Sequence, residues 1–334
     1  MPILQTQVID VLKTTYVPKL KKLLLNIGSI DGVEVIGNKV NVALRLNPLD
    51  EETLEQLKQI IIQRLTRLGA EVVDFEITFK ETPKIKHIIA IGSGKGGVGK
   101  STVTTNLAVA LANLSYKVGI MDADIYGPNI PKMFGAEQEL PKVTETRKMI
   151  PIEKFGVKLI SIGFLIEDPS TPVIWRGPLV TKALEQLYED VEWGELDFLF
   201  VDLPPGTGDV ALTIAQTLPT QYGIIVTTPQ SVSVLDASKA LNMFKQMNIE
   251  VLGIIENMAY FKCPHCGVKT EIFGAGGGKK LAENNDVPFL GSVPLEVQVR
   301  EGGDNGIPSF FIEGNSEVKD AFTKISNEIL KFIK

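Results

Sequence analysis

The residues with the clearest chemical potential form a glycine-rich segment that contains two lysines and ends in two hydroxyls. They are Gly94, Lys95, Gly96, Gly97, Val98, Gly99, Lys100, Ser101 and Thr102. Their spacing matches G-x-x-x-x-G-K-[ST], in which glycines let successive backbone N–H groups converge on a phosphate. A helix that begins at Lys100 would direct its positive end toward the same anion. Lys100 is predicted to neutralise the β- and γ-phosphates, and the Ser101 hydroxyl to ligate Mg²⁺.

Three aspartates follow apolar runs that are expected to be strands. Asp122 and Asp124 come after a run that ends at Met121, and Asp202 closes the run from Phe198 to Val201. Because the carboxyl ends of parallel strands meet at one sheet edge, these carboxylates are expected beside the phosphate loop. Asp202 is predicted to hold Mg²⁺ directly or through water. Asp124 is the candidate for orienting an attacking water and Asp122 for supporting the metal shell, with an ordinary acidic turn as the alternative.

The two cysteines of the chain, Cys263 and Cys266, stand in a Cys-Pro-His-Cys-Gly turn. Such a turn points both sulfurs at one metal, and two thiolates can begin a four-ligand site for Zn²⁺ or an iron-sulfur cluster. One chain cannot supply four sulfurs, whereas a two-fold dimer can, because symmetry duplicates each ligand. An intersubunit cluster, an intersubunit zinc ion, a redox dithiol and an inert pair are the readings of this motif.

The elements that must position these residues alternate from residue 87 onward between short apolar strands and helices. The strands are expected at His87–Gly92, Val118–Met121, Val157–Ile162, Asp197–Val201, Tyr222–Val226, Glu250–Ile255 and Pro288–Val293. A helix is expected from Lys100 to about Leu114. Near-continuous apolar strands between helices are typical of a parallel sheet that is covered on both faces. The predicted fold class is therefore α/β, a doubly wound and mostly parallel sheet over residues 87–334.

Residues 1–80 have a different pattern and predict a small α+β domain. Helical spacing is expected over Gln7–Leu12 and Val17–Leu25, and again over Asp50–Leu68, which has acidic residues in its first turn. Strands are expected at Gly32–Ile36, Lys39–Leu46 and Glu71–Phe79. The polar residues 81–86, which include a proline, are predicted to be a linker.

The sequence KGGVGKST, which begins at Lys95, resembles the deviant Walker A motif of the MinD/ParA-like ATPases. The resemblance implies an ATP sandwich dimer in which Lys95 crosses the interface to contact the partner's nucleotide. Such a lysine would stabilise charge on the transferred phosphoryl group, as an arginine finger does. A solvated surface lysine is the alternative. The resemblance also implies that Asn257 and the backbone near Pro294 contact adenine.

The motifs DADIYGPN, WRGP (residues 175–178), VDLPPGTGD, ENM and CPHCG follow the phosphate loop in this order. Together they resemble the Mrp/ApbC family of iron-sulfur cluster carrier ATPases. This resemblance implies a homodimer that binds ATP, Mg²⁺ and a [4Fe-4S] cluster on Cys263 and Cys266, hydrolyses ATP and transfers the cluster to apoproteins. Residues 1–80 resemble, more weakly, the small SufT-like domain that is often fused ahead of this family.

Composition limits the competing functions. A net charge of -6 argues against a general nucleic-acid surface, and no apolar stretch approaches the ~20 residues of a membrane span. The N-terminus lacks the pattern of a secretory signal, so a cytoplasmic protein is expected. The rivals are a MinD/ParA-like positioning ATPase, a dimeric ATPase with a structural zinc, and an electron-transfer reductase. The apolar spacing of Ser316–Lys334 fits either a surface-binding helix or a helix packed on the sheet.

Overall fold

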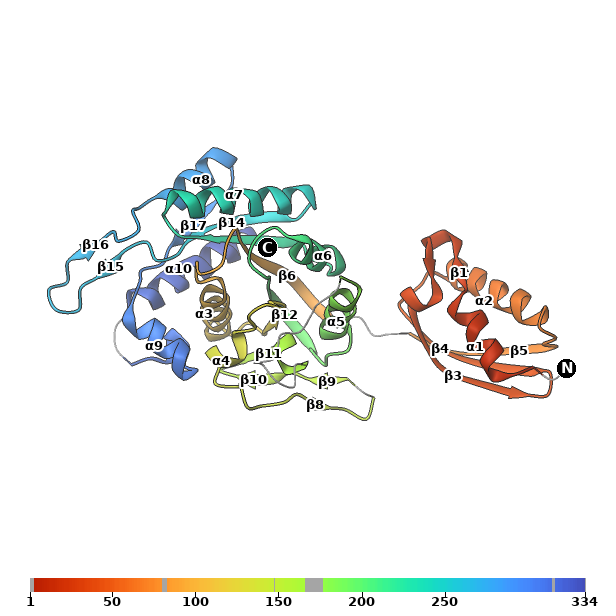
Figure 1. The fold of residues 1–334 in the computed structure, drawn as a ribbon. Coiled ribbons are helices and arrows are strands. Elements are labelled where there is room, and N and C mark those ends of the chain that lie inside the picture. Colours follow the sequence, from red (N-terminus) through yellow and green to blue (C-terminus); the bar gives the residue numbers. More distant parts are fainter. Residues whose placement is uncertain (1–2, 80–82, 147, 166–176, 314–315, 334) are drawn as a thin grey trace. The chain divides into compact units, whose positions relative to one another are not determined.

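A computed structural model describes residues 3–79, 83–146, 148–165, 177–313 and 316–333. The chain forms two compact units, Met1–Thr82 and Pro83–Lys334, each with its own hydrophobic core. Figure 1 shows the elements of both units.

The first unit is a three-stranded sheet covered on one face by two helices. Its elements are α1 (Gln5–Lys13), β1 (Tyr16–Val17), β2 (Lys22–Leu23), β3 (Gly28–Ile36), β4 (Lys39–Leu46), α2 (Glu51–Thr66) and β5 (Val72–Phe79). Strand β4 pairs antiparallel with β3 and parallel with β5. Every second residue of β4, from Val40 to Leu46, is buried in one core with α1 and α2, as the pleat of a half-covered strand requires.

The predicted helix over Val17–Leu25 is wrong. This segment contains the short antiparallel pair of β1 and β2, together with two 3₁₀ turns, Pro18–Leu20 and Leu24–Asn26. A proline disfavours the helical conformation of the residue before it, and Val17 is accordingly extended. Lys21 then adopts a positive φ of 54°. The helix-like apolar spacing arises because Val17 and Leu24 are both buried in the core of the unit.

Asp50 caps helix α2, and this cap predicts an acid-sensitive contribution to stability. Its carboxylate accepts the backbone N–H of Thr53 at 2.8 Å, and this bond, with those from the Thr53 hydroxyl and Lys19, lowers the pKa of Asp50 to about 2. A carboxylate with a lowered pKa stabilises the fold above its unfolded value of 3.8, and this contribution is lost as the pH falls toward 2. Asp50→Asn, which keeps a capping oxygen, should flatten the pH dependence of thermal unfolding between pH 5 and 2; an unchanged profile would contradict the assignment.

The second unit contains an eight-stranded sheet with the order β10-β11-β7-β12-β6-β13-β14-β17. Its strands are β6 (Lys84–Ser93), β7 (Val118–Asp122), β10 (Ile152–Lys154), β11 (Val157–Ser161), β12 (Glu195–Asp202), β13 (Tyr222–Thr227), β14 (Glu250–Glu256) and β17 (Phe289–Ser292). All neighbouring pairs are parallel except β10 with β11. Two small hairpins, β8 (Lys142–Val143) with β9 (Met149–Ile150) and β15 (Phe261–Lys262) with β16 (Lys269–Thr270), lie outside this sheet.

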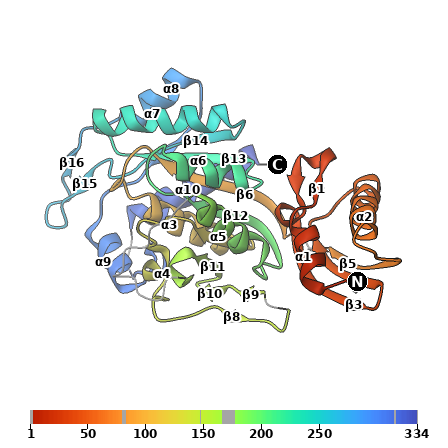
Figure 2. The same ribbon diagram turned by 45° about the vertical axis from the view of Figure 1, so that its right-hand side comes forward.

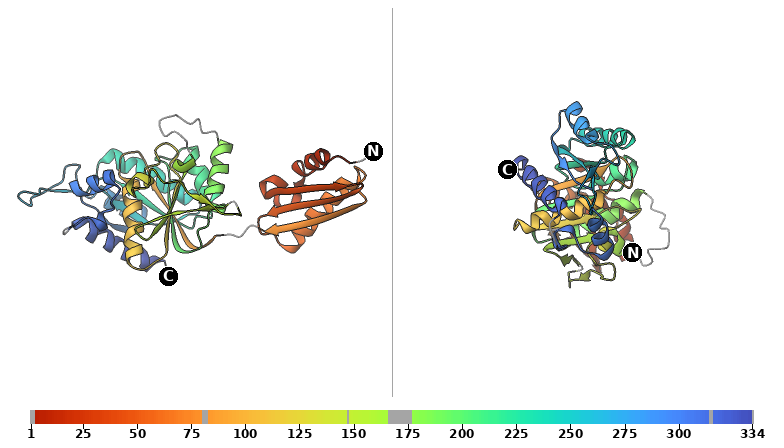
Figure 3. Two further views of the ribbon diagram at one scale, coloured as in Figure 1. Left: turned by 90° about the horizontal axis from the view of Figure 1, so that it is seen from below. Right: turned by 90° about the vertical axis from the view of Figure 1, so that its left-hand side faces the viewer.

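Helices cover both faces of the large sheet (Figures 1 and 3). One face packs against α5 (Gly177–Glu189), α6 (Asp209–Thr217), α7 (Ser231–Gln246) and α8 (Gly277–Asn285). The other packs against α3 (Lys100–Asn113), α4 (Ile130–Met133), α9 (Val297–Asn305) and α10 (Glu317–Phe332). The predicted doubly wound, mostly parallel α/β fold is confirmed.

The start of β6 differs from the prediction, and the packing of α10 decides between two alternatives. Strand β6 begins at Lys84, so residues 84–86 of the predicted linker are strand, because Lys84 and Ile85 pair with the start of β12. Residues 81 and 82 lie outside the described residues. Helix α10 buries Val318, Phe322, Ile325 and Ile329 in the core beside α3 and β17, which favours the packed-helix reading of the C-terminal segment. Among the described residues, none of the helices is long and apolar enough to cross a membrane.

Candidate nucleotide and metal site

Strand order brings the predicted site residues together. Strand β12 lies between β7 and β6, and Asp202 is in register with Asp122 on one side and with Ile91 on the other. The phosphate loop leaves β6 directly after Ser93 and continues into α3 at Lys100. Because all three strands are parallel, the loop and the carboxylates share one sheet edge.

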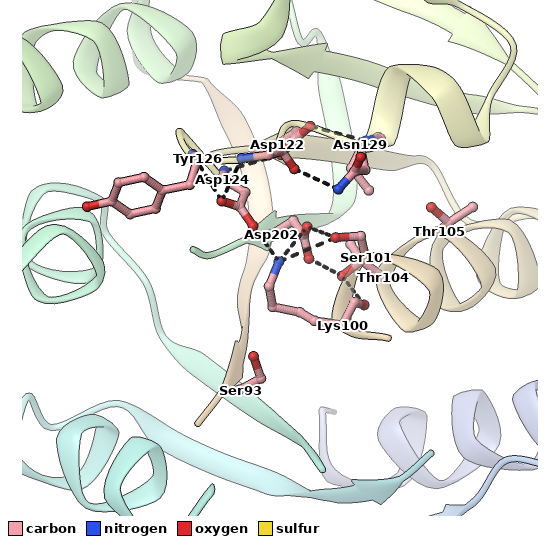
Figure 4. A network of polar contacts seen from close by, with 12 residues as sticks. Ser93, Lys100, Ser101, Thr104, Thr105, Asp122, Asp124, Tyr126, Asn129 and Asp202 are labelled. Atoms are coloured by element: carbon pink, nitrogen blue, oxygen red, sulfur yellow. Dashed lines mark hydrogen bonds and ion pairs between the residues drawn. The ribbon is translucent and has the colours of Figure 1, made fainter. Parts of the chain in front are cut away.

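Lys100 is the centre of a buried polar network (Figure 4). Its ammonium donates to Asp202 Oδ2 at 2.7 Å and lies 3.6 Å from Asp124 Oδ2. The Ser101 hydroxyl donates to the same Asp202 oxygen at 2.7 Å, and the Thr104 hydroxyl donates to Asp202 Oδ1 at 2.6 Å. The lysine predicted to bind phosphate is therefore held by carboxylates at the site.

The carboxylates of Asp122 and Asp124 differ in burial and in their hydrogen-bond partners. Asp122 is fully buried and accepts hydrogen bonds from Ser161 Oγ and from the backbone N–H groups of Ile130 and Asp124. Burial, then the charge of Asp202, raises the pKa of Asp122 to about 8. Asp124 is 7% exposed, and burial raises its pKa as well. Its Oδ1 accepts the N–H groups of Tyr126 and Gly127, and Oδ2 faces Lys100.

The donor set fits a magnesium ion. Two carboxylates, those of Asp202 and Asp124, and the Ser101 hydroxyl surround the one ammonium of Lys100, so the charge of the site is incompletely balanced. Hard oxygen ligands of this kind are what Mg²⁺ prefers, together with the oxygens of a nucleotide phosphate. Ser101 and Asp202 share a hydrogen bond and would hold the ion; bound there, it would neutralise charge on the phosphates. Both carboxylate oxygens of Asp122 already accept hydrogen bonds from the protein, so this residue would support the metal ligands without binding the ion itself.

Two glycines of the phosphate loop are required by geometry. Gly99, which precedes α3, has φ 81°, and a side chain there would meet the Asn257 amide at 2.2 Å. A Cβ at Gly94 would lie 2.0 Å from the backbone carbonyl carbon of Asp236 in α7. The loop therefore curls tightly while it packs against a neighbouring helix, as a cradle of backbone N–H groups must.

A cavity of about 430 Å³ opens beside the loop. Thr102, Asn257 and Pro294 contribute to its lining, with residues of α4 and α9. The Asn257 amide donates to the Val98 carbonyl oxygen at 2.8 Å, which fixes the loop. The structure thus places Asn257, which follows β14, and Pro294, which lies beyond β17, at one cavity next to the phosphate loop.

Lys95 is half-buried at the beginning of the loop. Within the described part of the chain, no carboxylate lies within ion-pair distance of its ammonium. It therefore takes no part in the network around Lys100, unlike the other residues predicted to be catalytic.

Cys263 and Cys266 lie in a hairpin at a distance from this network. We call residues 260–276, which include β15 and β16, the cysteine arm; it extends away from the sheet in Figure 2. Both thiols are free, Cys263 partly exposed and Cys266 exposed. The N–H groups of Cys266 and then His265 lower the pKa of Cys263. Across the described residues, no group of three His, Cys, Asp or Glu side chains could hold a metal ion, so one subunit offers only this pair.

Sequence reasoning missed two residues of the network, Thr104 and Ser161. Thr104 lies one helical turn after Lys100, a spacing that places both on one face of α3. Ser161 ends β11 opposite Asp122, and this register depends on strand order. Two residues of the WRGP motif, at positions 175 and 176, lie outside the described residues.

A known protein family matches most of the second unit. The model of the ParA family, described as a NUBPL iron-transfer P-loop NTPase, matches residues 84–330. The chain belongs to this family. The resemblance seen in the sequence to the iron-sulfur carrier ATPases and the predicted class, a P-loop nucleotide hydrolase of the MinD/ParA type, are confirmed.

Several relatives of this ParA/NUBPL protein carry the name iron-sulfur cluster carrier protein. The one from Helicobacter pylori is 39% identical over 343 residues, covering 99% of this chain and 93% of the relative. The one from Methanocaldococcus jannaschii is 52% identical over 252 residues, covering 75% and 86%. The first alignment includes the small N-terminal unit, so this unit is shared with that relative.

Two solved structures with bound nucleotide resemble this chain. A nucleotide-binding protein from Archaeoglobus fulgidus, in complex with ADP, has a TM-score of 0.61 at 40% identity and covers 68% of this chain and 89% of its own. The septum site-determining protein MinD from Pyrococcus horikoshii, with Mg-ADP, has a TM-score of 0.56 at 25% identity. The match covers 74% of this chain and 97% of the MinD chain.

Proposed function

We propose that this protein is an ATP-hydrolysing carrier that holds a [4Fe-4S] cluster between two subunits and delivers it to apoproteins. The observation that carries the proposal is that one chain combines a phosphate loop whose Lys100 contacts buried carboxylates with two free thiols, one exposed and one partly exposed. The names of the relatives support the cargo, and the ADP in the Archaeoglobus structure supports the nucleotide.

In the nucleotide site, Lys100 would exchange its carboxylate partners for the β- and γ-phosphates of ATP. Its ammonium lies between Asp202 and Asp124, so the same small region can hold phosphate, metal and attacking water. Asp124 is the proposed water-orienting group, because its Oδ2 faces the centre of the site. Lys95, which has no carboxylate partner among the described residues, is the proposed contribution from the second subunit. Asn257 and Pro294 would border the adenine in the adjoining cavity.

In the cysteine arm, Cys263 is prepared for ligation because its lowered pKa favours the thiolate. Two subunits would together supply four thiolates, the usual ligand set of a [4Fe-4S] cluster. The same four sulfurs would also suit zinc, which prefers a closed tetrahedral site. A positioning ATPase has no use for an exposed dithiol, so this reading explains less of the chain.

Anaerobic reconstitution with iron and sulfide tests the proposal. We expect about four iron and four sulfide per dimer, with an iron-sulfur chromophore, and dimers by light scattering. Parallel incubation with Zn²⁺ and transfer to a [4Fe-4S] apoenzyme complete the experiment. One zinc per dimer with no chromophore would replace the proposal by a structural metal site.

A further inference from the structure

The cysteine arm is held by polar contacts instead of a hydrophobic core. No residue from 260 to 276 is buried, and none belongs to the core of the unit. The paired strands β15 and β16 have two residues each. Because a short two-stranded hairpin is at best marginally stable alone, some other contact must fix its direction.

Glu317, the first residue of α10, provides such a contact. Its Oε1 accepts the Lys262 ammonium at 2.8 Å, and Oε2 accepts the Tyr260 hydroxyl at 2.7 Å and the Lys269 ammonium at 3.0 Å. The Lys269 ammonium also lies 4.2 Å from the centroid of the Tyr260 ring. One carboxylate thus receives three donors: one from β15, one from β16 and one from Tyr260, which precedes β15.

The charges explain why a carboxylate is needed at this place. Lys262 and Lys269 are direct partners across the β15–β16 pair. Like charges directly opposite each other destabilise an antiparallel pair, and this pair lies beside Cys263. Glu317 bonds both ammonium groups and so replaces repulsion with attraction. The three donors hold the pKa of Glu317 at about 2, so the carboxylate is charged at neutral pH.

The other end of this contact is rigid. Glu317 follows Ser316, whose hydroxyl caps α10 and also donates to Glu296 Oε2 at 2.7 Å. The helix then buries Phe322 and Ile325 in the core. The contact therefore connects a core helix to an arm that has no core of its own.

We propose that Glu317 is the positioning residue of the cysteine arm, closing the hairpin across its two lysines and fixing the direction in which Cys263 and Cys266 are presented. The role of Glu317 in presenting thiols to a second subunit rests on the proposed function. Its effect on the conformation of the arm is independent of that function. Single exposed ion pairs contribute little, but a network that shares one carboxylate is the favourable case.

Amide hydrogen exchange of the metal-free protein tests the effect on the arm. In Glu317→Gln, peptides covering residues 261–270 should exchange faster by roughly three- to tenfold, because a charged acceptor of three donors is lost. Glu328→Gln removes, from the same helix, a carboxylate whose one ion pair within the described part of the chain is with Lys331, and it should leave these peptides unchanged. Equal exchange in the two variants would overturn the proposal.

Charge reversal separates positioning from packing. The triple variant Glu317→Lys, Lys262→Glu and Lys269→Glu restores one charge between two opposite charges, so it should recover most of the slow exchange. Failure of the reversal to slow exchange relative to Glu317→Gln would count against a charge-based clamp.

Reconstitution then connects the arm to the cargo. Glu317→Gln should retain less iron chromophore than Glu328→Gln, and the reversal should recover it. If the wild-type protein takes up no cluster, the proposed function fails, while the exchange result still decides the role of Glu317. If the wild type is loaded and both glutamine variants retain equal iron, presentation of the thiols by Glu317 is refuted.

Discussion

Lys100→Ala and Asp124→Ala should both abolish ATP turnover, but only Lys100→Ala should destabilise the nucleotide-free protein. Among the residues that the structure describes, Lys100 is the only cation within ion-pair distance of Asp124 and Asp202. Removing it leaves buried carboxylates unbalanced, which costs about 3 kcal/mol. Its loss also removes the phosphate ligand, so hydrolysis should fall by at least ~10²-fold and ATP binding should weaken.

Asp124→Ala should leave the protein as stable as the wild type or more stable. Burial raises the pKa of this carboxyl group, which means that its charged form is disfavoured by the folded site at neutral pH. Substitution relieves that cost and the repulsion from Asp202, while the proposed water-orienting group is lost. Turnover should therefore fall without a matching loss of ATP binding.

Steady-state ATPase assays, nucleotide titration and thermal unfolding without nucleotide measure these effects. Lys331→Ala, which removes a surface lysine of α10 paired with Glu328, is the matched control and should resemble the wild type. Normal hydrolysis by either site variant would refute the role assigned to that residue. A Lys100→Ala protein more stable than Asp124→Ala would refute the charge balance.

The strand-end part of the site could be predicted because it depends on local sequence alone. Each parallel strand is a short apolar run, and the residue that ends it must emerge at the common edge. Asp122, Asp202 and the phosphate loop were located in this way, and β12 lies between the other two strands. The pairing of Ser161 with Asp122 depends instead on β11 being next to β7, which no local pattern specifies.

Two other features show the limits of reading a sequence locally. Val17 and Leu24 have helical spacing, but the proline at 18 and the left-handed Lys21 turn the chain twice within this segment. Glu317 contacts Lys262, a residue 55 positions away, and neither residue belongs to a recognised sequence motif. Long-range polar contacts of this kind have no period, so only the fold reveals them.

Cys263→Ala or Cys266→Ala should each eliminate cluster binding, because one substitution removes two of the four sulfurs from a symmetric dimer. Fewer than one tenth of the wild-type iron should remain after desalting, since two thiolates leave half of the cluster's ligand set empty. His265→Ala is the matched control, because this exposed side chain lies in the same turn. It should keep the chromophore, since the cysteines provide the ligands.

A cluster site shared between two subunits predicts a result for mixed dimers that a site within one chain does not. Mixed dimers of wild-type and Cys263→Ala/Cys266→Ala subunits contain only two thiolates, so they should lose the cluster although half of their subunits are intact. ATP hydrolysis by these dimers should persist, because the cysteine arm contributes nothing to the network around Lys100. Iron analysis of tag-purified mixed dimers gives the answer. A monomeric preparation that holds a complete cluster as tightly as the dimer would refute the shared site, because Cys263 and Cys266 would then suffice within one subunit.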